Sequence, residues 1–537
     1  MTRHLTALLV IGSLVAAGSA AASNHTLCVG KGHGCHATIQ SAVNAARDGD
    51  TIVVGPGTFA GGITIDKSIR LMGAGARQTV IRGGGPVLTI GAFLAPDPPT
   101  VTISGVTVTG GRTSSSAVSE EFVGEPNVIA AGGGIEVNPS EDFGEGATVT
   151  LKDSVVTGNR AVPTATVPSG AVICPGGDSC PFALAKGGGI DTWGALTLSN
   201  TTVTGNTAAG VASDALGGGI AVWNTGALKV VDSRLIGNTA RASKPNGRFA
   251  EGGAVYTDPG VALTFRDSVV DENRAHLTSD LPYFVEGADP IDMNANGGGI
   301  HSAGDADISI RGTSISRNAV SVRDLTGQPY GIASALLTSG DGHVELRDSR
   351  IEGNRLVAVV GSSADAGSTG DAIDINGPAT ISDSLIRGNS VLVVSPHGDA
   401  AANGTIYVDR GTEAALIENT VIAGNVSRAV SREGEATVQA AGVLNDGQLR
   451  LRDVLIADNV GKAIGESGFA QGGGIWNGAL LNEGPSELTL QRTTVTRNRV
   501  LASPGLDVAG AGIFTEFPIV FTNSRVVGNS PDQCSGC

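Results

Sequence analysis

The chain contains 537 residues, of which 80 are glycine, about twice the usual share. Only 22 residues are proline and glycine does not recur at every third position, which excludes collagen, while 41 % hydrophobic and 16 % charged residues argue against a disordered chain. The net charge of −16, without any cluster of lysine and arginine, argues against nucleic acid or an anionic membrane surface as a partner.

Residues 1–23 have the pattern of a secretory signal peptide. Arg3 and His4 form a short basic region, Leu5 to Gly18 form an apolar stretch, and small residues follow at 19–22. The apolar stretch is shorter than the roughly 20 residues that a membrane span needs. We therefore expect a bacterial protein that is exported, is secreted or extracellular, and has no membrane span.

The six cysteines form three pairs that are close in sequence. In an oxidising compartment such pairs predict local disulfides, here Cys28–Cys35, Cys174–Cys180 and Cys534–Cys537. A metal or redox motif is the alternative for the last pair, although an isolated pair at a terminus is weak support for it.

Residues 24–50 are expected to cap the N-terminal end of the fold. Ile39, Ala42, Val43 and Ala46 have helical spacing within residues 37–47, which predicts a short amphipathic helix. Such a helix would cover an open sheet edge that otherwise invites aggregation. Strand-like runs and glycine turns alternate from residue 51 to residue 110, as expected of about three divergent first turns of a repeat.

Eleven segments then end in an asparagine, at spacings of 31 to 47 residues. The residue three positions earlier is aliphatic in every copy, the residue eight positions earlier is apolar in every copy, and Ser or Thr stands five positions earlier in ten copies. The repeated asparagines are Asn159, Asn206, Asn238, Asn273, Asn318, Asn354, Asn389, Asn425, Asn459, Asn498 and Asn529. The pattern predicts an internal repeat in which each apolar column stacks on itself.

A second marker precedes most of these segments and is clearest in Gly187-Gly188-Gly189-Ile190. The distance from marker to asparagine is nearly constant, whereas the distance from asparagine to the next marker varies. We expect one solenoid turn per repeat, with a variable insert always on the same flank. Strands about 4.8 Å apart would make roughly 14 turns into a rod about 65 Å long, with an asparagine amide ladder and glycines at the corners.

These motifs resemble the right-handed parallel β-helix proteins of the pectate-lyase-like superfold, especially repeats of the polymorphic outer-membrane-protein type. Val156-Thr157-Gly158-Asn159 is similar to the Phe-x-x-Asn motif of that family, with an aliphatic residue in place of phenylalanine. The resemblance covers about residues 37–529. It does not extend to the C-terminal β-barrel of the autotransported members of that family. It implies an all-β, single-stranded right-handed parallel β-helix over residues 51–529, a short capping helix, and a tail at residues 530–537.

The resemblance also implies where catalysis would be sought, because enzymes of this superfold degrade acidic or neutral polysaccharides. The best carboxylate group is Asp365, Asp371 and Asp374, with His343 and His397 one turn away on either side. Solvated surface carboxylates are the simpler interpretation, because the expected Asp-Asp pair and the further motifs are missing.

Two further groups are candidates for binding. Asp280, Glu286, Asp289 and Asp292 could hold Ca²⁺ through oxygen ligands, although their spacing matches no known calcium loop and an ordinary acidic loop is the alternative. Trp193 and Trp223 fall on adjacent turns, on an outward column, where they could form a sugar platform or stiffen the sheet by ring packing.

The sequence favours a non-catalytic extracellular scaffold that binds polysaccharide or another surface component through one flank, without a cofactor, Ca²⁺ being the only one considered. A polysaccharide lyase or glycoside hydrolase using the Asp371 and Asp374 region is the first alternative. A passive surface stalk is the second.

Overall fold

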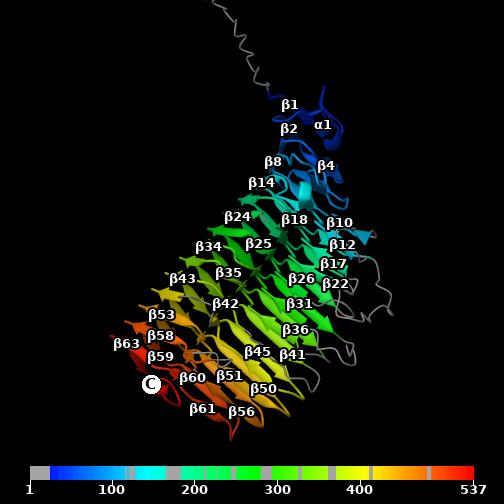
Figure 1. Ribbon diagram of the computed structural model, residues 1–537. Helices are drawn as coiled ribbons and strands as arrows, with labels where there is room; N and C mark the ends of the chain where they lie inside the picture. The colour runs from blue at the N-terminus through cyan, green and yellow to red at the C-terminus, as the bar shows by residue number, and fades with distance from the viewer. Residues whose placement is uncertain are drawn as a thin grey trace, which may run out of the picture.

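The computed structural model describes residues 24–537 apart from 115–117, 120–126, 165–182, 211–212, 225, 244–248, 280–292, 325–328, 361–370, 410–414 and 480–484. The chain winds around one axis, and its strands form three long parallel sheets that run along this axis (Figure 1). Sheet I has 15 strands from β1 (Thr26–Val29) to β63 (Ile519–Thr522), sheet II has 14 from β3 (Gly57–Ala60) to β64 (Arg525–Val527), and sheet III has 14 from β4 (Ile63–Ile65) to β65 (Cys534–Ser535). The predicted right-handed parallel β-helix is confirmed.

One repeat shows how the chain travels through the sheets. β13 (Ile135–Val137) lies in sheet III, β14 (Thr148–Lys152) in sheet I and β15 (Val155–Thr157) in sheet II. The chain then leaves through β16 (Arg160–Ala161), returns through β17 (Ala183–Lys186) and begins the next turn at β18 (Ile190–Thr192). Neighbouring turns are in register, so that Val149 pairs with Leu196 and Val156 with Val203. Each apolar column therefore stacks on itself, as expected from the repeat.

The predicted helix closes the N-terminal end of this stack. α1 (Ile39–Ala45) begins at Thr38, whose side chain accepts a hydrogen bond from the Ser41 N–H, and it buries Ile39, Ala42 and Val43. The Lys67 ammonium donates to the carbonyls of Val43, Asn44 and Ala46 at 2.9–3.1 Å, at the end of the helix where carbonyls lack partners.

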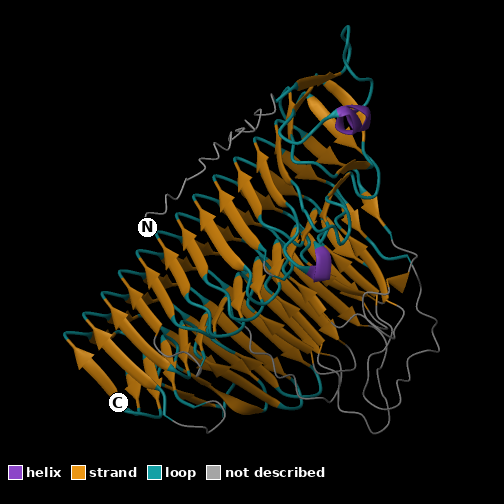
Figure 2. Cartoon of the chain, turned by 45° about the horizontal axis from the view of Figure 1, so that its top comes forward, coloured by secondary structure: helices purple, strands orange, loops and turns teal. Residues whose placement is uncertain are grey.

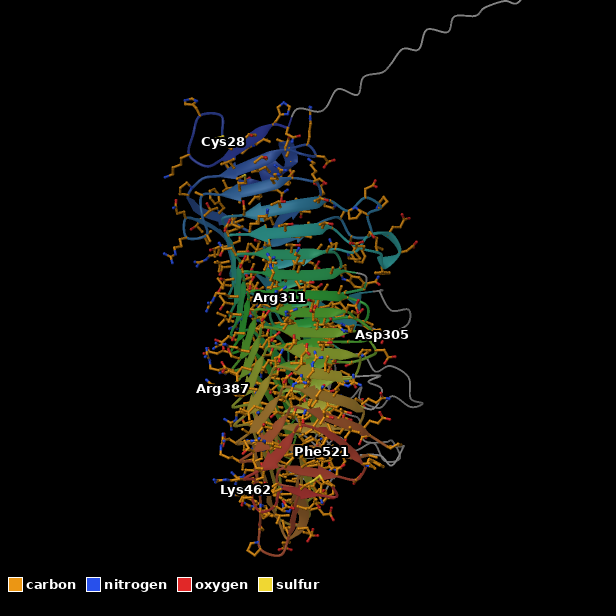
Figure 3. The ribbon with its side chains drawn as sticks, turned by 90° about the vertical axis from the view of Figure 1, so that its left-hand side faces the viewer. Cys28, Asp305, Arg311, Arg387, Lys462 and Phe521 are labelled. Carbon is orange, nitrogen blue, oxygen red and sulfur yellow. A yellow bond between two sulfur atoms is a disulfide. The ribbon has the colours of Figure 1, made fainter. Side chains whose placement is uncertain are left out.

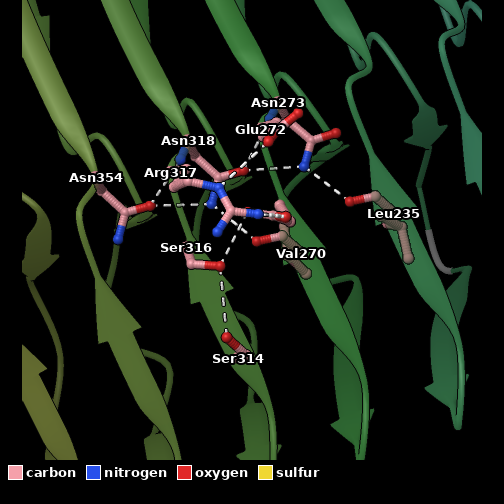
Figure 4. A network of polar contacts seen from close by, with 10 residues as sticks. Leu235, Val270, Glu272, Asn273, Ser314, Ser316, Arg317, Asn318 and Asn354 are labelled. Atoms are coloured by element: carbon pink, nitrogen blue, oxygen red, sulfur yellow. Dashed lines mark hydrogen bonds and ion pairs between the residues drawn. The ribbon is translucent and has the colours of Figure 1, made fainter.

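The repeated asparagines form a continuous ladder of buried amides (Figure 4). Asn318 donates from Nδ2 to the Val270 carbonyl and to the Asn354 Oδ1, both at 3.0 Å. Its own Oδ1 accepts from the backbone N–H and the Nδ2 of Asn273 at 3.0 and 2.9 Å. Every amide group of the ladder is therefore satisfied along the axis, which explains why asparagine recurs at this position.

The Ser/Thr column forms a second ladder at the corner between sheets I and II. The Thr201 N–H donates to Ser233 Oγ at 3.0 Å, and the Ser233 N–H donates to Ser268 Oγ at 3.2 Å. Each hydroxyl also donates to a nearby carbonyl, as Ser233 does to Val231 at 2.6 Å. Hydroxyl side chains thus satisfy turn groups of the backbone.

The glycine markers and the residues before the ladder asparagines are corners with positive φ, as expected. Gly187 has φ +56°, and Gly158, directly before Asn159, has φ +65°. Four turns place a different residue before the asparagine, and Glu272 and Arg317 adopt φ +57° and +50° there. Because L-residues are strained in this region, these turns carry a local cost that glycine avoids.

The variable inserts are not simple loops, because they begin and end as strands. Strands that leave the helix, such as β21 (Thr207–Ala209) and β26 (Thr239–Ser243), and strands that return, such as β22 (Ser213–Leu216) and β27 (Phe249–Glu251), join an 18-stranded sheet. Four later returning strands form a separate sheet. We call these strands the lateral arm; its own core is rich in alanine, including Ala185, Ala208, Ala215, Ala240 and Ala250. The arm runs along the stack on one side (Figures 1 and 2).

Two of the predicted disulfides are present, joining Cys28 to Cys35 and Cys534 to Cys537. Cys174 and Cys180 lie outside the described residues. The last disulfide follows the ladder, and β65 pairs with β62 (Ile513–Thr515) at the end of sheet III. In the described part of the chain, no helix has the length and apolar character needed to cross a membrane.

Candidate functional site

The lateral arm covers much of the outer face of sheet III. In each strand of this sheet the central side chain points away from the core of the helix, yet most of these residues are buried. Tyr256 is 8 % exposed and Trp476 2 % exposed. These aromatic side chains are therefore enclosed between the sheet and the arm.

A ladder of aromatic rings follows this face over the early turns. Phe93, Phe143, Trp193, Trp223, Tyr256 and His301 succeed one another with centroid distances of 5.4 to 6.2 Å. Trp193 and Trp223 are stacked at 6.1 Å. Trp223 is only 9 % exposed, so it packs against the Trp193 ring from the buried side. Phe93, at the outer end of the ladder, is 57 % exposed.

A cleft of about 300 Å³ opens at the exposed end of the ladder. Phe93 and Trp193 contribute rings to its walls, and Glu136, Lys186 and Asp191 contribute charged groups. Ile129, Ala130 and Ala131, from β12 (Asn127–Ala131) of the arm, line it as well. Apolar walls with a few convergent polar groups are typical of small-molecule and sugar sites.

The carboxylates in the cleft are positioned by the register of sheet III. Glu136 in β13 pairs directly with Asp191 in β18, so the two lie on adjacent turns about 4.8 Å apart along the axis. Asp191 is 1 % exposed and its Oδ1 accepts a hydrogen bond from Trp223 Nε1 at 2.7 Å. This bond fixes the carboxylate of Asp191 while the half-buried Glu136 lies nearer to solvent.

Lys186 lies at the end of β17, directly before the Gly187 marker. The residue is 6 % exposed, and its Nζ lies 4.6 Å from the centroid of the Trp223 ring and 5.2 Å from that of Trp193. These are cation–π distances. The arm strand thus places the Lys186 ammonium group beside the two indoles at the cleft.

Further along the same face, a buried polar cluster follows the last ring of the ladder. His301 Nδ1 lies 3.3 Å from Glu251 Oε2, with both side chains largely buried. Asn296 Nδ2 donates to Glu251 Oε1 at 3.0 Å. This cluster bridges sheet III and the returning strands β27 and β32 (Met293–Asn296).

Asp371 and Asp374 are buried rather than solvated at the surface, so the simpler interpretation of them was wrong. Asp371 is fully enclosed and Asp374 is 5 % exposed, because the outer face of sheet III is covered here too. Burial raises the pKa of Asp371, with the neighbouring Asp374 adding to it. Burial, together with the charge of Asp409, raises the pKa of Asp374 to about 8, against a hydrogen bond from Asn376 Nδ2 at 2.9 Å.

The structure does not bring the other predicted catalytic groups together with this pair. His397 is exposed and lies 2.9 Å from Glu433, and His343 is exposed directly before β39 (Val344–Arg347) of sheet I. Asp365 lies outside the described residues, as do Asp280, Glu286, Asp289 and Asp292. Among the residues that the structure describes, no group of three His, Cys, Asp or Glu side chains is arranged to hold a metal ion.

Sequence reasoning missed the cleft and its three charged residues Glu136, Lys186 and Asp191. Glu136 and Asp191 belong to the outward column that the repeat predicts, but nothing in the repeat pattern indicates that an arm strand covers that column. Lys186 has a sequence signal, because the equivalent position before the marker in other turns is Leu216, Glu251 or Asn296. A lysine there is the exception.

No protein-family model matches the sequence, and no curated protein matches it significantly. Similar solved structures include the A-module of the mannuronan C-5 epimerase AlgE6 of Azotobacter vinelandii, with 11 % identity over 92 % of this chain and 91 % of that one and a TM-score of 0.22. The PL6 family alginate lyase AlyGC matches with 8 % identity over 91 % and 98 % of the two chains and a TM-score of 0.17.

A third structure, sacteLam55A from Streptomyces sp. SirexAA-E, matches with 10 % identity over 94 % of this chain and 96 % of that one, at a TM-score of 0.17. Such identities and TM-scores carry no conclusion about activity. The fold follows from the chain's own strand pairing, in which turn after turn is parallel and in register. The chain is a right-handed parallel β-helix repeat protein.

Proposed function

We propose that the protein is a secreted, extracellular scaffold that binds a polysaccharide in the cleft between sheet III and the lateral arm. The observation that carries the proposal is the exposed ring of Phe93 beside a cleft lined by charged groups. The C–H face of a sugar ring packs on an aromatic ring, and its hydroxyl groups hydrogen-bond to carboxylates. The half-buried Glu136 supplies such an acceptor at the cleft, with the enclosed Asp191 beside it.

Trp193 and Trp223 have different roles in this proposal. Trp193 is half-buried, lines the cleft and offers the part of its ring that Phe143 and Trp223 leave uncovered. Trp223 acts indirectly, because its Nε1–H holds the Asp191 carboxylate. A ring-stiffening role and a ligand role are therefore compatible for this pair, with Phe93 as the main stacking surface.

Binding is favoured over catalysis because the predicted catalytic pair is inaccessible. A glycosidase needs two carboxylates that reach the scissile bond from either side of a bound sugar. Asp371 and Asp374 are enclosed, so a sugar could not approach them without displacement of the arm. Lyase or hydrolase activity, and a passive stalk, are retained as the outcomes that would contradict the proposal.

The test measures binding of the purified protein to polygalacturonate, alginate, chondroitin and neutral plant glycans by isothermal titration calorimetry. Phe93→Ala should weaken binding by at least about tenfold, corresponding to about 1.4 kcal/mol. Phe521→Ala is the matched control, because Phe521 is another exposed phenylalanine, 44 % exposed, in the last strand of sheet I (Figure 3). Binding of none of these glycans would support the stalk.

Release of unsaturated or reducing ends in the same incubations would support an enzyme. If that release disappeared in Asp371→Ala, which should still show the circular dichroism of a β-protein, the non-catalytic scaffold would be refuted. Equal affinities of the parent protein, Phe93→Ala and Phe521→Ala would instead place the ligand away from this cleft.

A further inference from the structure

The ammonium group of Lys186 has no hydrogen-bonding partner among the described residues. Its residue is 6 % exposed, and its recorded contacts are the faces of Trp193 and Trp223. Burial of a charge is unfavourable unless the charge is paired and hydrogen-bonded, and an ammonium carries three N–H donors. Ring faces attract a cation but accept hydrogen bonds poorly, so the donors of Lys186 are left for another group.

On the two neighbouring turns this position is occupied by residues that pack or pair within the protein. Two turns along, Glu251 occupies the equivalent place and contacts both His301 and Asn296. Leu216, on the turn between them, packs against the Trp223 and Tyr256 rings. Lys186 differs from these two residues because it lines the cleft.

The nearby carboxylates do not neutralise Lys186 directly. Asp191 is directed to Trp223 Nε1 through its Oδ1, and no carboxylate oxygen of the described residues is recorded within 4 Å of the Lys186 Nζ. Burial raises the pKa of Asp258, and the positive charge of Lys186 opposes this rise. The two side chains nevertheless form no ion pair within 4 Å. An anionic group entering the cleft would therefore meet a cation on a largely buried residue that has no ion-pair partner among the described residues.

We propose that Lys186 determines specificity by hydrogen-bonding an anionic substituent, a carboxylate or a sulfate ester, on the sugar held beside Phe93. The inference rests on the proposed function and deepens it, because it makes the ligand an anionic polysaccharide. Glu136 then accepts a sugar hydroxyl, and the negative charges of Glu136 and Asp191 disfavour a second anionic group next to the first. The cleft is suited to one charged group per bound segment.

The test compares polymers that differ in charge but share a backbone. Polygalacturonate is measured against its methyl-esterified form, and chondroitin sulfate against its desulfated form, at 0.15 M salt so that the protein's overall negative charge is screened. The parent protein should bind the charged form of one pair at least tenfold more tightly. The first pair reports a carboxylate and the second a sulfate ester.

Lys186→Met keeps the length and apolar body of the side chain but removes its charge. It should abolish the preference for the charged polymer while leaving affinity for the neutral form within about twofold, and Lys186→Arg should restore part of the preference. Lys229→Met, on an exposed lysine of sheet I, is the control and should change neither. Lys186→Gln provides a second neutral variant if methionine prevents folding.

The two proposals fail in different ways. If Phe93→Ala weakens binding but Lys186→Met keeps the preference for the charged polymer, Lys186 has only a packing role on the indoles and the inference is overturned. The inference is likewise overturned if the parent protein binds both forms of each pair equally. If neither Phe93→Ala nor Lys186→Met alters a measured affinity, the cleft itself is not the binding site.

Discussion

Gln533 completes the asparagine ladder by accepting hydrogen bonds from Asn529, the last asparagine of the repeat. Its Oε1 accepts from the Asn529 backbone N–H at 3.0 Å and from Nδ2 at 3.2 Å, where the next asparagine would otherwise stand. Its Nε2 donates back to the Asn529 carbonyl at 3.0 Å. A side chain from the tail thus substitutes for a missing turn.

Removing this terminal amide should loosen the last turn. Gln533→Ala removes the acceptor of the Asn529 backbone N–H and of one Nδ2 hydrogen bond, whereas Nδ2 still donates to the Val495 carbonyl, and it should lower stability by about 1–3 kcal/mol. Hydrogen exchange should speed up in β63 and β64 but not near α1. Gln448→Ala, at an exposed glutamine of β53 (Gln448–Arg452), serves as the control. Unchanged exchange at the C-terminal end would show that the tail does not cap the ladder.

A central ladder position should be far less tolerant. Asn354→Ala removes four bonds within a buried stack and should cost at least about 3 kcal/mol in thermal or chemical unfolding. Asn354→Asp keeps the shape but buries a carboxylate, so it should be least stable at neutral pH and recover as the pH falls to about 4. A small loss for Asn354→Ala, below about 1 kcal/mol, would contradict the proposed importance of the ladder.

Two glycines allow backbone strain to be separated from steric exclusion. Gly237 has φ +63° and a Cβ there would meet no atom within 4 Å, so Gly237→Ala should cost about 1–2 kcal/mol from conformation alone. A Cβ on Gly218 would lie 2.2 Å from the Thr239 backbone carbon, so Gly218→Ala should cost about 3 kcal/mol or prevent folding. Equal unfolding midpoints for the two variants would argue against this distinction.

The buried Asp374 predicts a stability that falls as the pH rises. Its pKa in the folded protein, about 8, lies above the ordinary value of 3.8, so the folded state holds the proton more strongly than the unfolded state. The contribution is complete below about pH 4 and is lost progressively up to about pH 8. Asp374→Asn should remove this slope and raise stability at pH 8 by about 1–3 kcal/mol.

Asp453 provides a control of opposite sign for this pH series. The Arg492 guanidinium, whose Nε and Nη2 each lie 2.7 Å from an Asp453 oxygen, lowers the pKa of that exposed carboxyl. Asp453→Asn should therefore affect stability only through a small contribution that is present above about pH 4 and lost in acid. A pH profile unchanged by Asp374→Asn would refute the assignment of the alkaline slope to Asp374.

The regular part of the fold was predictable because each repeat places the same kinds of residue at the same turns of the backbone. Asn318, Ser233 and Gly187 occupy positions whose backbone geometry admits few other residues, so their recurrence in the sequence reveals the turn. The end of the ladder was not predictable in this way. Gln533 occurs once, and only the three-dimensional position of the tail gives it a role.

The site was less predictable because it depends on the lateral arm. Alternating alanines in segments such as Thr239–Ser243 did carry a signal for thin, closely packed strands, but the variable length of the inserts suggested loops. Without the arm, Asp374 reads as a surface carboxylate and Tyr256 as an exposed ring. Burial under a second layer reverses both interpretations and leaves Phe93 as an exposed ring at the outer end of the aromatic ladder.

The ladder also makes the length of the molecule adjustable in whole steps. Each asparagine accepts from one neighbour the same hydrogen bonds that it donates to the other. Removing or duplicating one complete turn would therefore leave every donor and acceptor of the ladder paired. The helix α1 and Gln533 close the two ends whatever number of turns separates them. Unequal recombination between repeats could therefore set the reach of the rod in increments of about 4.8 Å, while the cleft near its N-terminal end stays intact.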